Sequence, residues 1–212
     1  MKRPNLLAGE SLPPAPRQQR SIAKRARLQN AALALFGEKG YESTSIEEIT
    51  LRAKLALGTF YQHYRSKRQL LLFLMDDLLE KLSLLKLQPQ DSSNMRAALR
   101  GMLTRAFAAD LHYLGAYRAW QEAILCDASL WQKDAAIHGW SVARVRELFE
   151  RLQRHPQARR NSDIAGMAIA MDSFFWSLLA QAVRMPRPRL EQQIDVATHL
   201  IYHALFHDAA AN

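Results

Sequence analysis

The sequence predicts an all-α protein made of two helical parts, and three observations carry this prediction. Apolar residues recur at helical spacing along most of the 212 residues. No segment alternates apolar and polar residues as a half-buried strand would. Prolines are absent between Pro16 and Pro89, which predicts one compact helical block followed by a second helical region.

The composition is sufficient for a sizeable core, because 49% of the residues are hydrophobic, and the use of only one cysteine suits a reducing cytoplasm. The single cysteine, Cys126, excludes an intramolecular disulfide; it is either a redox switch or, more simply, a buried and inert thiol. The N-terminus lacks the apolar core of a secretory signal. Residues 164–183 are apolar over the length of a membrane span, but Asp172 at their centre predicts a buried helix and no membrane partner.

The net charge of +9 is concentrated near the N-terminus. Residues 1–70 hold 13 Lys or Arg and 5 Asp or Glu, whereas residues 71–212 hold 16 and 15. A localised positive charge neutralises phosphates and releases counterions when it meets nucleic acid. A charge that served only solubility would be spread more evenly, so we expect double-stranded DNA as a partner.

Residues 1–20 contain four prolines and few apolar residues, which predicts a disordered basic tail. Such a tail either enters a minor groove of DNA or stays passive in solvent. A helix is expected over residues 21–38, where apolar residues follow the i, i+3, i+4, i+7 rule, with Gly40 as a left-handed cap. Three basic residues at its start face either the DNA backbone or solvent: Lys24, Arg25 and Arg27.

Two short helices joined by a tight turn are predicted next. Ser45 and Glu48 have the spacing of a capping box, so the first helix begins directly after Ser45. The second helix spans residues 57–64, and Ser66 with Gln69 repeats the capping signal before a third helix. Two helices with such a turn form a helix-turn-helix, whose second helix lies in the major groove of DNA.

Residues in the leading helix, the turn region and the following helix form one recognisable pattern. They are Leu28, Ala31, Ala32, Leu35, Phe36, Gly40, Tyr41, Thr44-Ser45-Ile46, Gly58-Thr59-Phe60-Tyr61, His63-Tyr64, Ser66-Lys67 and Leu70-Leu71. Over about fifty residues this pattern resembles the DNA-binding domain of the tetracycline-repressor (TetR) family of bacterial regulators. The resemblance implies a helix-turn-helix DNA-binding domain at residues 21–66 and a helical effector-binding and dimerisation domain at residues 67–212.

Several side chains in this stretch can bind DNA. Thr59 can contact a base edge or a phosphate, and Tyr61 and His63 can donate to phosphates. Lys67 can do so beside the free N–H groups that begin its helix, and Leu57 can lie against a thymine methyl group. With the positions that the resemblance adds, the candidate DNA-binding residues are Thr44, Ser45, Leu57, Gly58, Thr59, Tyr61, His63 and Lys67.

Three positions depart from the common pattern of the TetR family. Lys54 stands where a turn glycine is usual, and a left-handed lysine there costs about 1 kcal/mol. Ala56 replaces a Ser or Thr cap, at a cost of about 0.5–2 kcal/mol. Leu57 replaces a residue that is often polar, which leaves the operator sequence open but not the docking mode. Phe60 and Tyr64 are expected in the core.

A long helix over residues 67–87, ended by residues 88–91, is the only covalent link to the C-terminal part. Further helices are expected over residues 95–111, 114–126, 128–155, 163–184 and 190–206, with caps at Asn94, Asp127 and Ser162. The last two helices carry broad apolar surface, which is filled either within one subunit or by the same helices of a second copy. A two-fold homodimer through them would set two recognition helices about 34–36 Å apart on a palindromic site.

Large aromatic and flexible side chains gather in the C-terminal part. Such residues line an apolar pocket, and they fill an ordinary core equally well. The TetR resemblance implies a pocket for a small apolar or amphipathic effector, which would favour a dimer that no longer matches the groove spacing. The candidate ligand-binding residues are Met102, Phe107, Tyr117, Trp120, Trp140, Met171 and Phe175.

His199, His203 and His207 recur at every fourth residue of the last helix, a spacing that could hold a metal ion. No further ligand motif accompanies them, and the helix dipole favours histidines near a C-terminus in any case. The sequence holds no hydrolytic triad, P-loop or dinucleotide-binding glycine motif. We expect no metal, no cofactor and no enzymatic activity.

These observations favour a cytoplasmic, homodimeric transcriptional repressor that a small effector releases from a palindromic operator. The alternatives are a DNA-binding architectural protein without an effector, an activator, and an enzyme or carrier that uses the C-terminal pocket.

Overall fold

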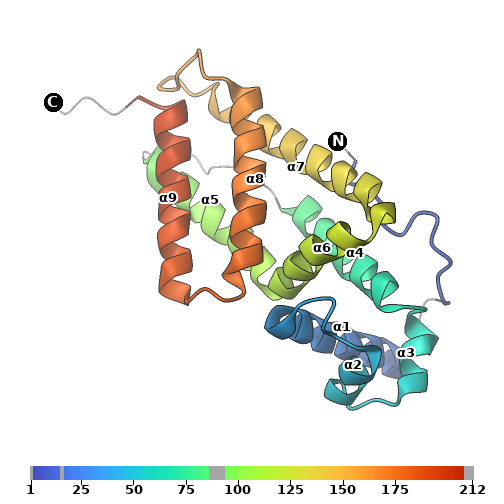
Figure 1. Cartoon of the computed structure of the whole chain (residues 1–212). Coiled ribbons are helices and arrows are strands. Elements are labelled where there is room, and N and C mark those ends of the chain that lie inside the picture. Colours follow the sequence, from blue (N-terminus) through green and yellow to red (C-terminus); the bar gives the residue numbers. More distant parts are fainter. Residues whose placement is uncertain (1, 15–16, 86–93, 208–212) are drawn as a thin grey trace.

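The computed structural model describes residues 2–14, 17–85 and 94–207. Apart from an isolated β-bridge between Ala158 and Phe206, the regular elements in these ranges are helices, which confirms the predicted all-α class (Figure 1). The α-helices are α1 (Gln19–Lys39), α2 (Ile46–Arg52), α3 (Leu57–His63), α4 (Lys67–Leu84), α5 (Met95–Asp110), α6 (Leu114–Cys126), α7 (Trp131–Leu152), α8 (Ile164–Ala182) and α9 (Arg187–Leu205). Short 3-10 helices, η1 (Leu111–Tyr113) and η2 (Ala128–Leu130), precede α6 and α7.

The predicted helices differ from these bounds by a few residues, mainly where the caps differ. The Asp163 side chain caps α8 by accepting from the Gly166 N–H at 2.9 Å. Ser162, the predicted cap, instead donates its hydroxyl to the carbonyl oxygen of Ala204 at 2.8 Å. The predicted end of the helix that begins at Lys67 falls partly on residues 86–93, which lie outside the described residues.

Helices α1, α2 and α3 pack around a small core at one end of the molecule (Figure 1). The capping box predicted for α2 is confirmed: the Ser45 hydroxyl accepts from the Glu48 N–H at 3.2 Å, and the Glu48 carboxylate accepts from the Ser45 N–H at 2.9 Å. Phe60 and Tyr64 are buried as predicted, with ring centroids 5.6 Å apart. This core fixes the orientation of α3 relative to α1 and α2.

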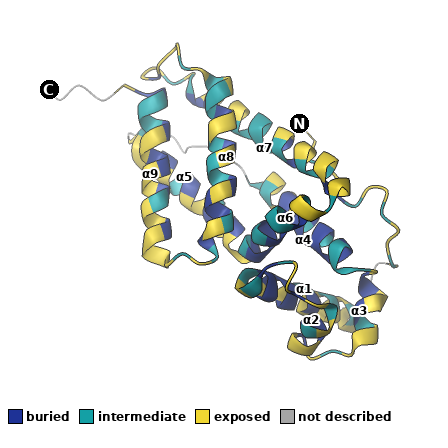
Figure 2. Cartoon of the chain, in the orientation of Figure 1, coloured by how far each residue is buried: buried dark blue, intermediate teal, exposed yellow. Residues whose placement is uncertain are grey.

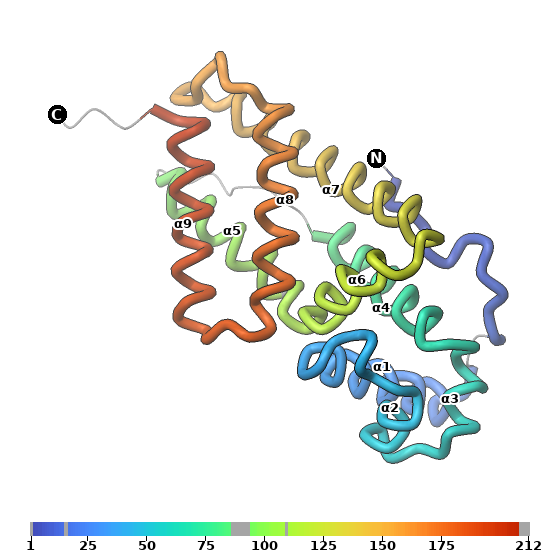
Figure 3. Tube along the Cα trace, in the orientation of Figure 1, coloured from blue at the N-terminus to red at the C-terminus, as the bar shows by residue number. Residues whose placement is uncertain are grey.

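Helix α4 runs from this core into the C-terminal domain (Figure 3). There α6 packs against α1, α4 and α8, while α7 packs along α8 and α5 packs against α9. Arg144 of α7 donates to the carbonyl oxygens of Leu82 at 2.7 Å and Leu85 at 3.0 Å, which satisfies acceptors at the end of α4. The N-terminal and C-terminal helices are therefore connected through the chain of α4 and also through the contact of α1 with α6.

The N-terminal segment differs from the predicted disordered tail, because residues 3–10 pack against the helices. Leu6 is 1% exposed, and its N–H donates to the Asp76 carboxylate of α4 at 3.0 Å. Arg3 forms an ion pair with the same carboxylate at 2.8 Å, and Glu10 pairs with Arg68 at 3.0 Å. One buried leucine and these ion pairs hold a segment whose composition alone suggested disorder, and Arg3 is not free to enter a minor groove.

Helix α8 has the length and apolar composition of a membrane span, and only 22% of that apolar stretch is buried. The prediction that this stretch is buried is therefore wrong for most of its length, and Figure 2 shows exposed positions along both α8 and α9. Asp172 at its centre is buried and lies 2.5 Å from the Nδ1 atom of His138 on α7. A paired charge in the middle of the helix fits packing against protein better than lipid.

Candidate DNA interface and ligand cavity

The turn between α2 and α3 has the strained geometry that its sequence predicts. Lys54 adopts a positive φ of 53°, which is the left-handed conformation expected there. The guanidinium of Arg27 on α1 donates to the carbonyl oxygens of Ala53 at 2.5 Å and Lys54 at 2.9 Å. Ala56 provides no side-chain cap to α3, as expected. Arg27 therefore holds the turn from outside, and its role is structural.

One face of α3 is open to solvent. Tyr61 is 52% exposed and Leu57 is 41% exposed. Gly58 is exposed, and a β-carbon built on it would meet no atom within 4 Å. Thr59 is half-buried, and Gln62 is an exposed neighbour that the sequence reasoning missed. Contact of these residues with DNA stays a prediction, and the exposed face meets the steric condition for it.

Two of the candidate DNA-binding residues are buried instead. The Thr44 hydroxyl donates to the carbonyl oxygen of Gly40 at 2.7 Å, and the residue is 1% exposed. His63 is 6% exposed, and neither ring nitrogen has a hydrogen-bond partner among the described residues. Burial lowers the pKa of His63, and the nearby Arg25 and Lys24 lower it further. Neither side chain reaches a phosphate from this position, because both point into the domain.

Lys67 is also engaged within the domain. Its ammonium donates to the carbonyl oxygens of Tyr41 at 2.7 Å and Thr44 at 2.9 Å, and it lies 4.3 Å from the centre of the Tyr41 ring. Burial lowers the pKa of Lys67. Its role as a phosphate ligand is therefore corrected to that of a clamp on the loop between α1 and α2. Ser45 is exposed, but its hydroxyl oxygen already caps α2.

Exposed cations nevertheless surround the open face of α3. Lys24, Lys54 and Arg65 are exposed, and none of them has an ion pair among the described residues. Arg25, in contrast, lies 4.4 Å from the centre of the Phe73 ring and is partly covered. The unpaired cations are the better candidates for contact with phosphates.

An apolar cavity of about 140 Å³ lies among the C-terminal helices, lined mainly by α5, α7 and α8 and by single residues of α4, α6 and α9. Four predicted ligand-binding residues line it: Met102, Phe107, Tyr117 and Phe175. The sequence reasoning missed the other lining residues, which are Leu82, Leu103, Ala106, Asp110, Ser141, Val145, Leu148, Phe149, Trp176, Leu179 and Ile201.

The remaining three predicted ligand-binding residues do not line this cavity. Trp120 is fully buried, and its Nε1–H donates to the Asp134 carboxylate at 2.8 Å. Trp140 is buried against Arg144, whose guanidinium lies 4.9 Å from the ring centre. Met171 packs against the hydrophobic core. These residues belong to the core, which their composition could not distinguish from a pocket.

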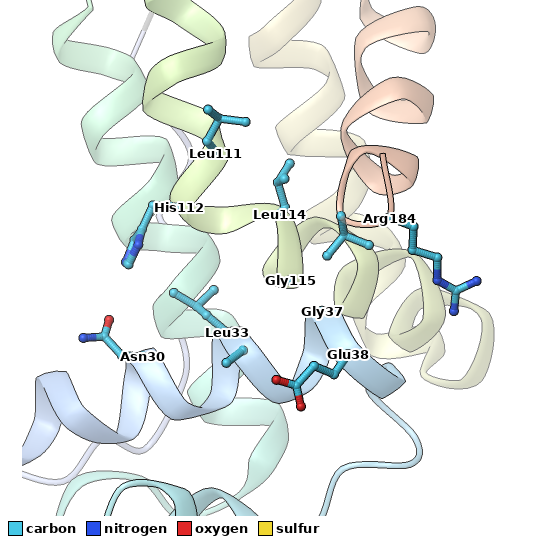
Figure 4. A pocket seen from close by; sticks show the side chains of 11 residues that line it. Asn30, Leu33, Gly37, Glu38, Leu111, His112, Leu114, Gly115 and Arg184 are labelled. Atoms are coloured by element: carbon cyan, nitrogen blue, oxygen red, sulfur yellow. The ribbon is translucent and has the colours of Figure 1, made fainter. Parts of the chain in front are cut away.

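The contact between the two domains is a close crossing of α1 and α6 (Figure 4). Gly37 of α1 faces Gly115 of α6, and Arg118 of α6 donates to the Gly37 carbonyl oxygen at 2.8 Å. The Glu122 carboxylate accepts from the Tyr41 N–H at 2.6 Å, just beyond the end of α1. An open cleft of about 560 Å³ lies beside this crossing and is bordered by Asn30, Leu33, Leu111, His112 and Arg184, among others.

A family model described as "Bacterial regulatory proteins, tetR family" matches residues 28–74, which span the end of α1, the helix-turn-helix and half of α4. By this match, the chain carries the DNA-binding region of the TetR family at these residues. It is 50% identical over 44 residues to the transposon Tn10 TetC protein of Escherichia coli, a stretch that covers 21% of this chain and 22% of that protein. The matches to curated relatives cover between 17% and 32% of the length of those proteins.

Solved structures extend this likeness to the fold of most of the chain. A regulatory protein TetR from Rhodobacter sphaeroides matches with a TM-score of 0.67 at 19% identity, over 84% of this chain and 98% of that one. A complex of SmeT with triclosan matches with a TM-score of 0.65 at 20% identity, over 88% of this chain and 93% of that one. The family is one of regulatory proteins and not of enzymes, as the sequence predicted.

Two further expectations concern the cysteine and the histidines. Cys126 is exposed at the end of α6, so the interpretation as a buried thiol is wrong. His199 and His203 lie with ring centroids 4.1 Å apart. Within the described residues, no group of three or more His, Cys, Asp or Glu side chains is placed to hold a metal ion.

Proposed function

We propose that this protein is a cytoplasmic transcriptional repressor that binds a palindromic DNA site as a homodimer and leaves it when a small amphipathic molecule occupies the C-terminal cavity. The observation that carries the proposal is the double role of α6. This helix holds Tyr117 on the cavity and Gly115 and Glu122 against the DNA-binding domain. A ligand that displaces Tyr117 would therefore displace the support of α1.

The coupling needs no contact between the ligand and the helix-turn-helix. Gly115 and Tyr117 are two residues apart on the same helix, so a displacement of Tyr117 would carry Gly115 with it. A shift of α6 would change the orientation of α1 and, through the shared core, of α3. A ligand that binds this shifted arrangement more tightly shifts the population toward it, and it lowers DNA affinity by the same differential free energy.

The open face of α3 supports binding in a major groove. Its Leu57, Gly58 and Tyr61 stand clear of the domain, and exposed Lys24, Lys54 and Arg65 are available for phosphates. Phosphate contacts would set the register, and Leu57 would favour a thymine at the position it meets.

The exposed faces of α8 and α9 support a homodimer. Exposed residues on α8 recur every four positions and are mostly small: Ala165, Ile169, Ser173, Ser177 and Gln181. Val196 and Leu200 are exposed on α9. Small side chains on one stripe allow a second helix to approach closely, and the same surface on a second copy would complete a two-fold interface.

The solved complex of SmeT with triclosan supports a small-molecule effector, since that protein shares the fold. The volume and apolar lining of the cavity suit a molecule with an apolar body, and the lining polar groups, Asp110, Tyr117 and Ser141, would orient it.

Selection of bound fragments from random DNA tests the proposal. We expect an enriched palindrome, which Gly58→Glu abolishes because it places a negative charge on the open face of α3 without a steric clash. Gly139→Glu is the matched control, since Gly139 on α7 has equally open space. Enrichment without a palindrome would favour the architectural alternative, and unchanged binding by Gly58→Glu would reject the interface.

A further inference from the structure

Asp110 is a carboxyl group without a cationic partner on the wall of the C-terminal cavity. It ends α5, is 7% exposed, and accepts a hydrogen bond from the Tyr117 hydroxyl at 2.7 Å. Tyr117 is its one hydrogen-bond partner among the described residues. None of the residues that line the cavity is Lys, Arg or His. A buried carboxylate in such surroundings lacks the compensation that buried charges require.

The pKa of Asp110 reflects this isolation. Burial raises it to about 7, and the hydrogen bond from Tyr117 opposes the shift only in part. The second buried carboxylate nearby, Asp172 on α8, differs because His138 of α7 lies 2.5 Å from it. The hydrogen bond with Asp172 raises the pKa of His138. Of these two neighbouring acids, the protein therefore compensates Asp172 and leaves Asp110 on the cavity wall uncompensated.

Aromatic rings stand beside this carboxyl group. The rings of Tyr117 and Trp176 meet edge to face with centroids 5.0 Å apart, and those of Phe107 and Phe175 meet in the same way at 5.4 Å. All four line the cavity. Aromatic faces attract organic cations, and this attraction is strongest where water is excluded.

We propose that the cavity binds a small lipophilic organic cation, a quaternary ammonium or protonated amine, with its charge against Asp110 and its apolar body among Phe107, Phe175 and Trp176. The proposal deepens the proposed function, on which it rests for the consequence of binding. A cavity of about 140 Å³ is close to the roughly 150 Å³ that holds a benzene molecule, so the body of the ligand is about one aromatic ring.

Benzyltrimethylammonium is a suitable probe, because its charge does not change with pH. Its binding to the DNA-free protein is measured by calorimetry at pH 6 and pH 8. With a pKa of about 7, the ionised fraction of Asp110 rises about tenfold over this range, and we expect the affinity to rise by up to about the same factor. Tyr117 stays neutral because burial raises its pKa well above the usual value. The His138–Asp172 pair, however, is a second titratable group close to the cavity.

The Asp110→Asn variant shows whether the dependence on pH comes from Asp110 or from that pair. This variant keeps the shape of the side chain, and we expect it to weaken binding about tenfold or more at pH 8 and to remove the rise with pH. Glu150→Gln is the control, since Glu150 is an exposed acid on α7 that pairs with Arg146. Circular dichroism verifies that each variant is folded, and Tyr117→Phe, which retains the carboxyl group, should keep the dependence on pH.

Equal affinity of the wild type and Asp110→Asn for the probe, or no binding by the wild type at pH 8, would overturn the cation site. Release of DNA is measured separately with the same probe. Tight, Asp110-dependent binding without release would leave the cation site in place and contradict the proposed function. Release of DNA by neutral benzyl alcohol, without binding of the cation, would contradict the cation site and leave the proposed function in place.

Discussion

Gly115 of α6 presses against Leu33 of α1 so closely that a β-carbon on Gly115 would overlap the Leu33 carbonyl oxygen. The atom that would be displaced is backbone, so a rotamer change cannot relieve the overlap. The backbones of α1 and α6 are therefore in close contact at this crossing, which has no room for a side chain at Gly115.

Gly115→Ala should lower the free energy of unfolding by about 1–3 kcal/mol, because α1 and α6 must separate to admit the methyl group. Gly139→Ala is the matched control on α7, where the β-carbon meets no atom within 4 Å. Alanine there should stabilise the helix by about 0.5–1 kcal/mol. Urea unfolding measures both variants, and a Gly115→Ala protein as stable as the wild type would contradict the crossing.

Lys54→Gly should stabilise the protein by about 1 kcal/mol, because the left-handed conformation at this position disfavours any residue with a β-carbon. Thermal unfolding measures the change. Lys54→Ala removes the same charge but keeps the β-carbon, and it should bring no stabilisation. If alanine stabilised the protein as much as glycine, charge would be the cause and the strain argument would fail.

Lys67→Met should change the stability of the protein, whereas Arg65→Met should change its binding to DNA. Loss of the Lys67 ammonium leaves the carbonyl oxygens of Tyr41 and Thr44 without a donor, at a cost of about 1–3 kcal/mol in stability. Loss of the exposed Arg65 cation should leave stability unchanged and reduce the salt slope of DNA binding by about 1. Unfolding and DNA titrations at several salt concentrations distinguish the two roles. A lower salt slope in Lys67→Met, at unchanged stability, would restore Lys67 as a phosphate ligand.

His63→Leu should leave DNA affinity unchanged and make the protein less sensitive to acid. Burial lowers the pKa of His63 below 6.5, so the unfolded chain binds a proton more readily than the folded one. The stability that this difference provides is complete above pH 6.5 and is lost as the pH falls through the lowered pKa. Unfolding between pH 7 and pH 5 measures the change, and a large loss of DNA affinity in the variant would show that His63 reaches the DNA.

The sequence predicted what local contacts determine. Ser45 and Glu48 cap α2 because both partners lie within one helical turn, and Lys54 is left-handed because the short turn requires it. The fate of Lys67 could not be predicted in this way, because its partners Tyr41 and Thr44 come from a loop more than twenty residues away. Without them, an ammonium at a helix start looks like an anion ligand.

The cavity was predictable only in part for a similar reason. Phe107 and Tyr117 line it, whereas Trp120 is buried elsewhere, although all three are large aromatic residues on neighbouring helices. Only the packing of the helices around the cavity, from α4 to α9, decides which side chains meet the empty space. Asp110 was missed because periodicity arguments consider apolar residues, and a lone acid at a helix end is usually solvated.

The exposed thiol at the last position of α6 is a site for a fluorescent label that reports movement of this helix. Cys126 is the only cysteine in the sequence, so a maleimide dye would label this one helix without any prior mutagenesis. Fluorescence from that dye would follow the displacement of α6 in real time, from addition of a ligand to departure of the operator.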